Sequence, residues 1–207
     1  MNHFIKALSQ ICKEHLLEEK WLIAPDKRSG NQWLETITRN GQPTININIK
    51  TIKSMALDIA ALKMTQMGVT LISPIEAEVE IHRIWGNLKT TFSNGYLSKL
   101  KHDMDLSRAI NKSINSMRLA GLTSREVLLG KFENKAKGHE LSSVLEEYLK
   151  SLKKNNWIDY SDVLRAAIEI IQKDAKKYFK DIVILMQKDR DLHGLEKQLI
   201  KIVLAKT

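Results

Sequence analysis

The sequence predicts an α/β protein, in which a parallel sheet is interrupted by a large all-helical insertion. Short apolar runs alternate with helical patterns over the first 73 residues, which is typical of β/α units. A long helical stretch follows, and a last apolar run at 181–186 restores the strand pattern. We therefore expect the last strand to rejoin the first sheet. The predicted domains are residues 1–73 plus 179–207, and an inserted helical domain at 74–178.

Three strands are predicted before residue 74, each bounded by a change of hydrophobic period or a turn signal. Proline ends the first strand, and the alternation Thr-Ile-Asn-Ile-Asn-Ile marks the second, with its isoleucines on one face. The predicted elements are, in order, a helix at 4–16, a buried strand at 21–24, a helix through Trp33 and Ile37, a strand at 44–49, a helix at 51–67 and a strand at 69–72.

The inserted region gives helical patterns alone, and no strand is predicted between residues 74 and 172. It starts at Ser73-Pro74-Ile75-Glu76, which has a cap, a proline at the first helical position and a capping-box glutamate. Three apolar stripes at helical spacing follow: Leu106, Ile110, Ile114 and Met117, then Leu141, Leu145, Tyr148 and Leu152, then Leu164, Ala167, Ile168 and Ile171. A buried strand at 181–186 and a helix through Leu195, Leu199 and Ile202 complete the chain.

The segment Asn156–Arg165 joins an aromatic residue, two spaced carboxylates and the start of an apolar helix. Asp159 stands where an N-cap is expected, and Asp162 adds negative charge to the first turn of a helix that begins near Tyr160. Without further information, this pattern indicates a well-capped helix whose Trp157 packs on the core.

Composition favours a folded protein with anionic partners. The formal net charge is +9 over 207 residues, which fits nucleic acid but also fits a solvated basic surface. Cys12 is the only cysteine, so an intrachain disulfide and a multi-cysteine zinc site are excluded. The sequence has neither a signal peptide nor an apolar run of membrane-spanning length, so we expect a cytoplasmic protein without a membrane partner.

Two basic segments are candidate nucleic-acid contacts. Lys27 and Arg28 follow the first strand, where a phosphate loop would lie, although this turn has one glycine and lacks a Gly-Lys-Ser/Thr sequence. Lys50, Thr51, Lys53 and Ser54 lie where the second strand opens into a helix. A solvated turn and a Thr or Ser helix cap, respectively, are the structural alternatives.

Sites for other chemistry are not evident. The six histidines have no metal-ligand spacing, so no metal and no cofactor are predicted. Asp189 and Asp191 follow the last strand, a place where magnesium-binding carboxylates occur, but a polar turn has the same composition.

The order of these segments resembles the first motor domain of superfamily 1 helicases of the UvrD/Rep type. It resembles more closely the degenerate, ATPase-dead N-terminal modules of AddB/RexB-type helicase–exonuclease subunits, which belong to the PD-(D/E)XK nuclease family. The matching segments are Lys20–Leu34, Asn48–Ala56, Trp157–Leu164 and Asp181–Ile200. The resemblance implies a RecA-like (P-loop NTPase-like) sheet, and it makes Asp159, Tyr160, Asp162 and Asp191 family-motif positions.

The departures from the family pattern imply a loss of catalysis. Gln187 and Lys188 fall where active relatives have a magnesium-binding acidic pair, and the phosphate-loop lysine is missing. We therefore expect a non-hydrolysing module of a DNA repair or recombination exonuclease, with no catalytic residue of its own. Its expected partners are single-stranded DNA and a helicase or nuclease subunit. The chain is too short for the second motor domain or the nuclease domain, so we expect a fragment or a truncated relative.

Two alternatives remain open. One is an active ATP- or metal-dependent nucleic-acid hydrolase, for which Asp159, Asp162, Asp189 and Asp191 are the candidate acids. The other is a structural adaptor, which an exposed apolar patch on the helical insertion would favour.

Overall fold

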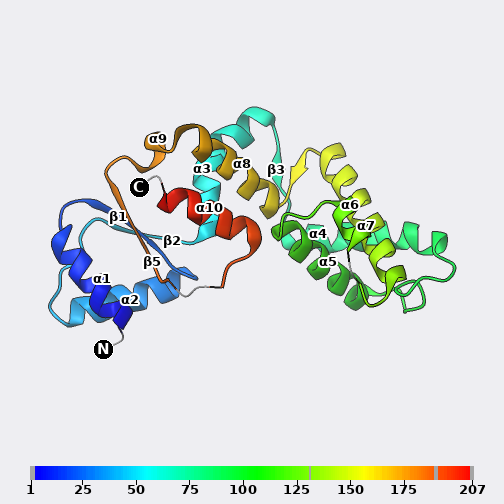
Figure 1. The fold of residues 1–207 in the computed structure, drawn as a ribbon, viewed down its shortest axis with the longest axis horizontal. Helices are drawn as coiled ribbons and strands as arrows, with labels where there is room; N and C mark the ends of the chain where they lie inside the picture. Colours follow the sequence, from blue (N-terminus) through cyan, green and yellow to red (C-terminus); the bar gives the residue numbers. More distant parts are fainter. Residues whose placement is uncertain (1–2, 131, 189–190, 206–207) are drawn as a thin grey trace. The chain divides into compact units, whose positions relative to one another are not determined.

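The structure, a computed structural model, describes residues 3–130, 132–188 and 191–205 (Figure 1). The chain forms two compact units. We call residues 1–61, 164–192 and 196–207 the sheet unit, and residues 62–163 and 193–195 the helical unit. The boundaries near residues 61 and 163 fall inside helices α3 (Ile52–Met67) and α8 (Tyr160–Asp174). The domain division predicted from the sequence, at 73/74 and 178/179, stays a prediction.

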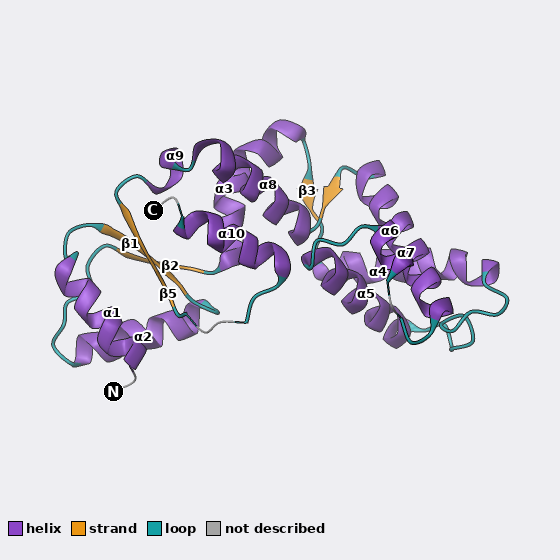
Figure 2. Cartoon of the chain, in the orientation of Figure 1, coloured by secondary structure: helices purple, strands orange, loops and turns teal. Residues whose placement is uncertain are grey.

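A three-stranded parallel sheet with the order β2-β1-β5 lies at the centre of the sheet unit (Figures 1 and 2). β1 (Glu19–Ile23) is the middle strand, between β2 (Ile47–Lys50) and β5 (Ile182–Met186). The predicted return of the last strand to the first is therefore confirmed. Because the strands are parallel, their carboxyl ends meet at one edge, with Ile23 in register with both Lys50 and Met186.

Helices cover both faces of this sheet. α1 (His3–Glu14) and α2 (Lys27–Arg39) pack on Leu22 and Leu185 through a small core that contains Leu8, Cys12 and Ile37. Figure 1 shows α3, α8 and α10 (Gly194–Leu204) on the opposite side of the sheet. The short helix α9 (Lys176–Phe179) places Phe179 edge-on against Trp21, with 5.8 Å between the ring centroids.

Two strands of the sheet unit differ from their predicted form. β2 begins at Ile47 rather than Thr44, because Asn46 has a φ of 53° and its side chain donates a hydrogen bond to the Leu17 carbonyl. β5 was predicted to be buried, but only Leu185 is buried, because β5 is an edge strand and lacks a second neighbour.

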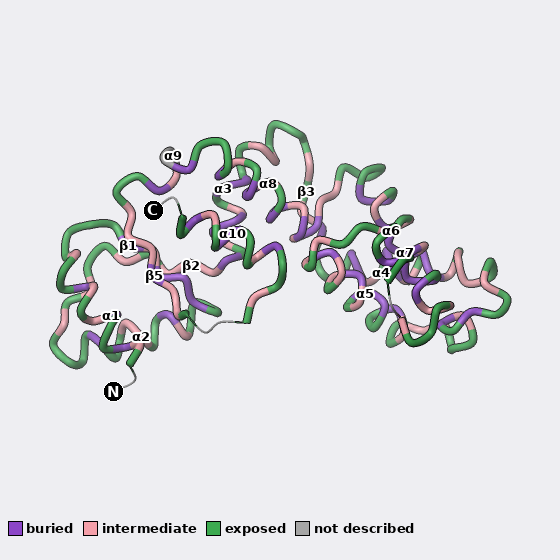
Figure 3. The backbone as a smooth tube through the Cα atoms, viewed as in Figure 1, coloured by how far each residue is buried: buried purple, intermediate pink, exposed green. Residues whose placement is uncertain are grey.

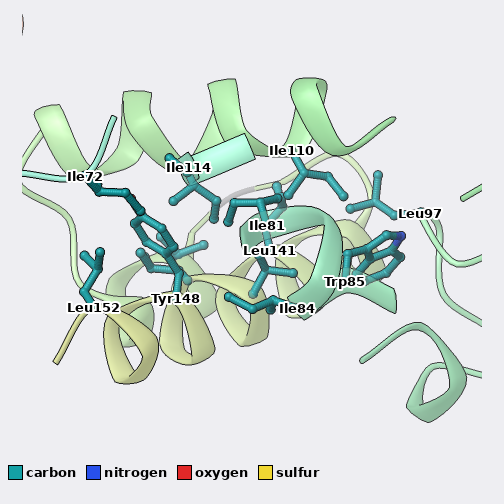
Figure 4. Close-up of a cluster of buried hydrophobic side chains, with 14 residues drawn as sticks. Ile72, Ile81, Ile84, Trp85, Leu97, Ile110, Ile114, Leu141, Tyr148 and Leu152 are labelled. Atoms are coloured by element: carbon teal, nitrogen blue, oxygen red, sulfur yellow. The ribbon is translucent and has the colours of Figure 1, made fainter. Parts of the chain in front are cut away.

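The helical unit is built around the facing surfaces of α4, α5 and α7. Its core contains Trp85 and Tyr148, which are fully buried, and apolar side chains from all three helices meet between them (Figure 4). The buried positions recur along α7 at helical spacing, as the tube in Figure 3 shows and as the sequence predicts. The elements of this unit, besides the end of α3 and the starts of α8 and α10, are β3 (Thr70–Leu71), α4 (Pro74–Leu88), η1 (Lys89–Thr91), α5 (Met104–Leu119), α6 (Ser124–Leu129), α7 (Lys135–Lys154) and β4 (Trp157–Ile158).

The prediction of an insertion without strands is wrong, because β4 pairs in parallel with β3. This ladder is a separate two-stranded sheet, so the strand predicted at 69–72 does not join the main sheet. Two backbone hydrogen bonds hold it, from Thr70 N to the Asn156 carbonyl and from Ile72 N to the Ile158 carbonyl, each 2.9 Å. A two-residue strand is too short to show the alternation that identifies strands in sequence.

Glu140 of α7 holds the loop that follows η1. Its carboxylate is fully buried and accepts hydrogen bonds from the backbone N–H groups of Tyr96, Leu97 and Ser98, at 2.8 to 2.9 Å. Gly95 precedes these residues, and a Cβ atom there would overlap the Glu140 carboxylate. A buried carboxylate is stable when backbone donors surround it in this way, so Glu140 fixes this loop to α7.

Glu140→Ala is expected to lower the free energy of unfolding by roughly 3 kcal/mol, because three backbone donors lose a buried charged acceptor. Urea denaturation followed by circular dichroism measures this loss. The control is Glu133→Ala at an exposed site, which should change stability by less than about 0.5 kcal/mol. Equal effects of the two substitutions would contradict the role assigned to Glu140.

Candidate functional site

The carboxyl edge of the main sheet gathers three of the segments singled out in the sequence. The turn after β1, the start of α3 after β2 and the residues after β5 all leave the sheet at this edge. Ligands of open parallel sheets bind outside the carboxyl ends of the strands, especially where neighbouring strands connect in opposite directions. The fold therefore places the predicted phosphate-loop region and the predicted nucleic-acid contacts at one candidate site.

The N-terminus of α2 is occupied by the chain itself. Asp26 caps this helix and accepts hydrogen bonds from Ser29 N at 2.7 Å and from the Ser29 hydroxyl at 3.1 Å. The backbone bond from Ser29 is the main reason why the pKa of Asp26 is lowered. A helix N-terminus is a natural anion site, and here a side-chain carboxylate fills it.

Gly30 meets the main sheet directly. A Cβ atom at Gly30 would lie 2.5 Å from Cγ2 of Ile49 in β2, so this glycine is required for the close approach of α2 to the strand. The predicted basic residues, Lys27 and Arg28, are exposed in the first turn of α2. Thus the only glycine of the predicted phosphate loop serves packing.

The predicted contacts after β2 separate into two groups. Thr51 Oγ1 accepts a hydrogen bond from Ser54 N at 3.0 Å, and Ser54 Oγ accepts one from Thr51 N at 2.9 Å, so both hydroxyls cap α3. Lys50 Nζ donates to Asp58 at 2.6 Å and lies over the Trp21 ring. Lys53 is exposed on the first turn of α3. Thr51 and Ser54 therefore make the bonds that the capping alternative expects, and their contact with nucleic acid stays a prediction.

The end of β5 has no acidic pair at the two positions that follow the strand. Gln187 is half-buried and Lys188 is exposed, while Asp191 is exposed further along. Asp189, the other candidate acid here, lies outside the described residues. Among the described residues, no three His, Cys, Asp or Glu side chains come together as a metal site requires.

The family-motif residues of the helical unit form a buried ion-pair cluster with an arginine. Arg118 of α5 donates from Nε and Nη2 to both carboxylate oxygens of Asp159, at 2.8 and 2.9 Å, and from Nη2 to Asp162 at 2.6 Å. Asp159 Oδ1 also accepts from Asp162 N at 3.0 Å, which confirms the predicted N-cap of α8. Tyr160, which follows Asp159 in the sequence, is half-buried.

Burial and charge perturb this cluster. Burial and the neighbouring Asp159 charge raise the pKa of Asp162, against the opposing effect of Arg118. The two carboxylates raise the pKa of the Arg118 guanidinium although burial lowers it. The nearby Tyr148 hydroxyl is buried without a hydrogen-bond partner among the described residues, and burial raises its pKa. The cluster joins α5 to the start of α8 and buries the Asp159 carboxylate against Arg118, which favours a structural role.

A second polar network lies between α4 and α7. Glu80 accepts two hydrogen bonds from Arg83, at 2.6 and 3.0 Å, and one from the Ser151 hydroxyl. The hydrogen bonds from Arg83 are the main reason why the pKa of Glu80 is lowered, although burial opposes them. Among the described residues, Arg83 is the one cation that forms an ion pair with the Glu80 carboxylate.

Sequence reasoning missed Arg118, Glu140 and this Glu80 network. Arg118 and Glu140 bond to residues 41 to 44 positions away, so no local spacing could reveal the pairings. A weak signal was present, because Arg118 follows Ile110 and Ile114 on the apolar stripe of α5, where a charged residue needs a buried partner.

Arg118→Met is expected to lower the free energy of unfolding by about 3–5 kcal/mol, because it leaves two carboxylates without their cation in a buried site. Guanidinium denaturation measures the change. Arg125→Met, at an exposed position of α6, is the matched control and should cost less than about 0.5 kcal/mol. A stability of Arg118→Met equal to that of the control would show that the cluster contributes nothing.

Among the described residues, none of the helices has the length and apolar character needed to cross a membrane.

Comparison with known proteins identifies the family. The comparison with curated proteins finds no match. Residues 6–204 match the family model of the UvrD/REP helicase N-terminal domain, which confirms the UvrD-type resemblance read from the motifs. Since this match spans most of the chain, the chain belongs to the UvrD/REP helicase N-terminal domain family.

Proposed function

We propose that this chain is a helicase-like module that binds single-stranded DNA and does not hydrolyse ATP. In this proposal it serves a DNA repair or recombination helicase–exonuclease, as an AddB/RexB-type module with a RecA-like sheet. The observation that carries the proposal is the Asp26 carboxylate on the N-terminus of α2, at the turn after β1. A nucleotide phosphate bound there would have to displace this carboxylate or bear its repulsion.

The residues after β5 support the loss of hydrolysis. Magnesium in nucleotide hydrolases is held by oxygen ligands, usually carboxylates and substrate phosphates. Gln187 provides one amide oxygen and Lys188 a cation, which is a poor set for a divalent metal. No nucleotide or metal cofactor belongs to the proposal.

The charge distribution supports DNA binding. Arg28, Lys27 and Lys53 project from the carboxyl edge of the sheet on exposed helix starts, and the chain as a whole has a formal charge of +9. Basic side chains at helix starts suit phosphate contacts, which give affinity without sequence specificity. We extend the proposal to a helicase or nuclease partner subunit, or further domains, that would complete the binding surface.

The active-hydrolase alternative has little support in the described residues. Asp159 and Asp162 are bonded to Arg118 and belong to the helical unit, while Asp191 belongs to the sheet unit and is exposed.

A protein-interaction adaptor is the second candidate function. Ile75 and Val79 lie one turn apart on α4 and are 75% and 55% exposed, which is unusual for a pair of β-branched residues on one helix face. A partner that covers this face would explain their exposure.

Binding of a fluorescent oligothymidine, followed by anisotropy over a range of salt concentrations, tests the DNA part of the proposal. The affinity should fall steeply with salt. The double variant Arg28→Ala/Lys53→Ala should bind several-fold more weakly and lower the slope of log affinity against log salt by about 1.4, because each single-strand phosphate contact contributes about 0.7.

The control is Lys6→Ala/Lys13→Ala, which removes the same charge from exposed positions of α1. Binding that is insensitive to salt, or no binding at tens of micromolar protein, would refute DNA binding and favour the adaptor.

A further inference from the structure

The helical unit contains a groove between α4 and α7 that no motif prediction identified. It has a volume of about 530 Å³, within the range of small-ligand sites. Each helix contributes residues three or four positions apart, so one face of each helix forms a wall. The lining residues are Glu80, Arg83, Ile84, Asn87 and Leu88 from α4, Glu147, Lys150, Ser151 and Lys154 from α7, and Asn155 and Trp157 after it.

Three cationic side chains line the groove, and they differ in their ion-pair partners. Glu80 fixes the Arg83 guanidinium through Nε and Nη2, which leaves Nη1 as a free donor among the described atoms. Lys150 is paired with Glu146 and Glu147. Lys154 is exposed, forms no ion pair in the described part of the chain, and its charge contributes to the lowered pKa of Glu80. Arg83 and Lys154 therefore provide positive charge to an anion in the groove.

The other wall suits a flat, partly apolar group. Trp157 is half-buried beside the groove, where Ile84 and Leu88 add apolar surface. The side-chain amides of Asn87 and Asn155 supply donors and acceptors, and Asn155 is positioned by its hydrogen bonds to Ser151. An aromatic side chain next to cations is the combination that binds a base and its phosphate in single strands.

We propose that this groove binds a short segment of single-stranded nucleic acid, with phosphates at Arg83 and Lys154 and a base against Trp157. The inference rests on the proposed function and extends it, because it places a second contact in the helical unit. Glu80 is a positioning residue here, since it orients Arg83. Neighbouring acids limit the positive charge of the groove, so the aromatic contact is needed for affinity.

Lys154→Ala and Lys153→Ala form a matched pair for the test. Both lysines are exposed in the last turn of α7, but only Lys154 lines the groove. In the oligothymidine assay, Lys154→Ala should weaken binding about threefold or more and lower the salt slope by about 0.7, the contribution of one phosphate contact. Lys153→Ala should leave the slope unchanged. Equal effects would overturn the groove as the site.

Trp157→Leu is a second, independent variant, which keeps an apolar side chain against the core but removes the aromatic stacking surface. It should weaken oligothymidine binding about fivefold or more at constant salt, as expected for loss of one stacked base. Circular dichroism checks the fold, and if Trp157→Leu does not fold, the lysine pair decides alone.

The outcomes separate this inference from the proposed function. If the wild-type protein binds oligothymidine and both Lys154→Ala and Trp157→Leu bind it with the same affinity, the groove is not the site. DNA binding at the sheet would then still stand. A wild-type protein that does not bind oligothymidine overturns both. Displacement of the oligonucleotide by micromolar thymidine monophosphate would assign the groove to a free nucleotide and overturn the single-strand assignment.

Discussion

The parallel pairing of β5 with β1 is the interaction on which the candidate site depends. β5 comes from the last quarter of the chain, after residues 62–163 of the helical unit, and lies beside the first strand in a register that runs from Glu19 and Ile182 to Ile23 and Met186. This pairing directs three chain segments to one edge of the sheet. A phosphate site in such folds needs a helix N-terminus at this edge, and α2 provides one.

At this N-terminus the chain supplies its own anion. Asp26 satisfies the free backbone donor of Ser29, and Thr51 and Ser54 satisfy each other at the start of α3. Such caps stabilise the helices by about 1 kcal/mol each and use the donors that a phosphate would otherwise bind. In the proposed function, the same edge keeps its basic side chains for DNA, while the chain's own caps occupy the helix N-termini.

The elements that depend on local sequence could be predicted. Helical stripes such as Leu141 to Leu152 repeat over several turns, and the caps at Ser73 and Asp159 need only neighbouring residues. The missed features depend on distant partners. β4 has two residues and is a strand because it pairs with β3. Arg118 donates hydrogen bonds to Asp159, 41 positions further along the chain. The groove between α4 and α7 likewise follows from helix packing, which no single helix encodes.

Titration of the wild-type protein with magnesium ATP, followed by calorimetry and by phosphate release, tests most directly the claim that the phosphate site is filled. The account predicts no saturable binding at millimolar nucleotide and no turnover, with or without single-stranded DNA. Saturable binding in the micromolar range that Arg28→Ala abolishes would contradict the account, because a triphosphate would then occupy the turn that Asp26 closes.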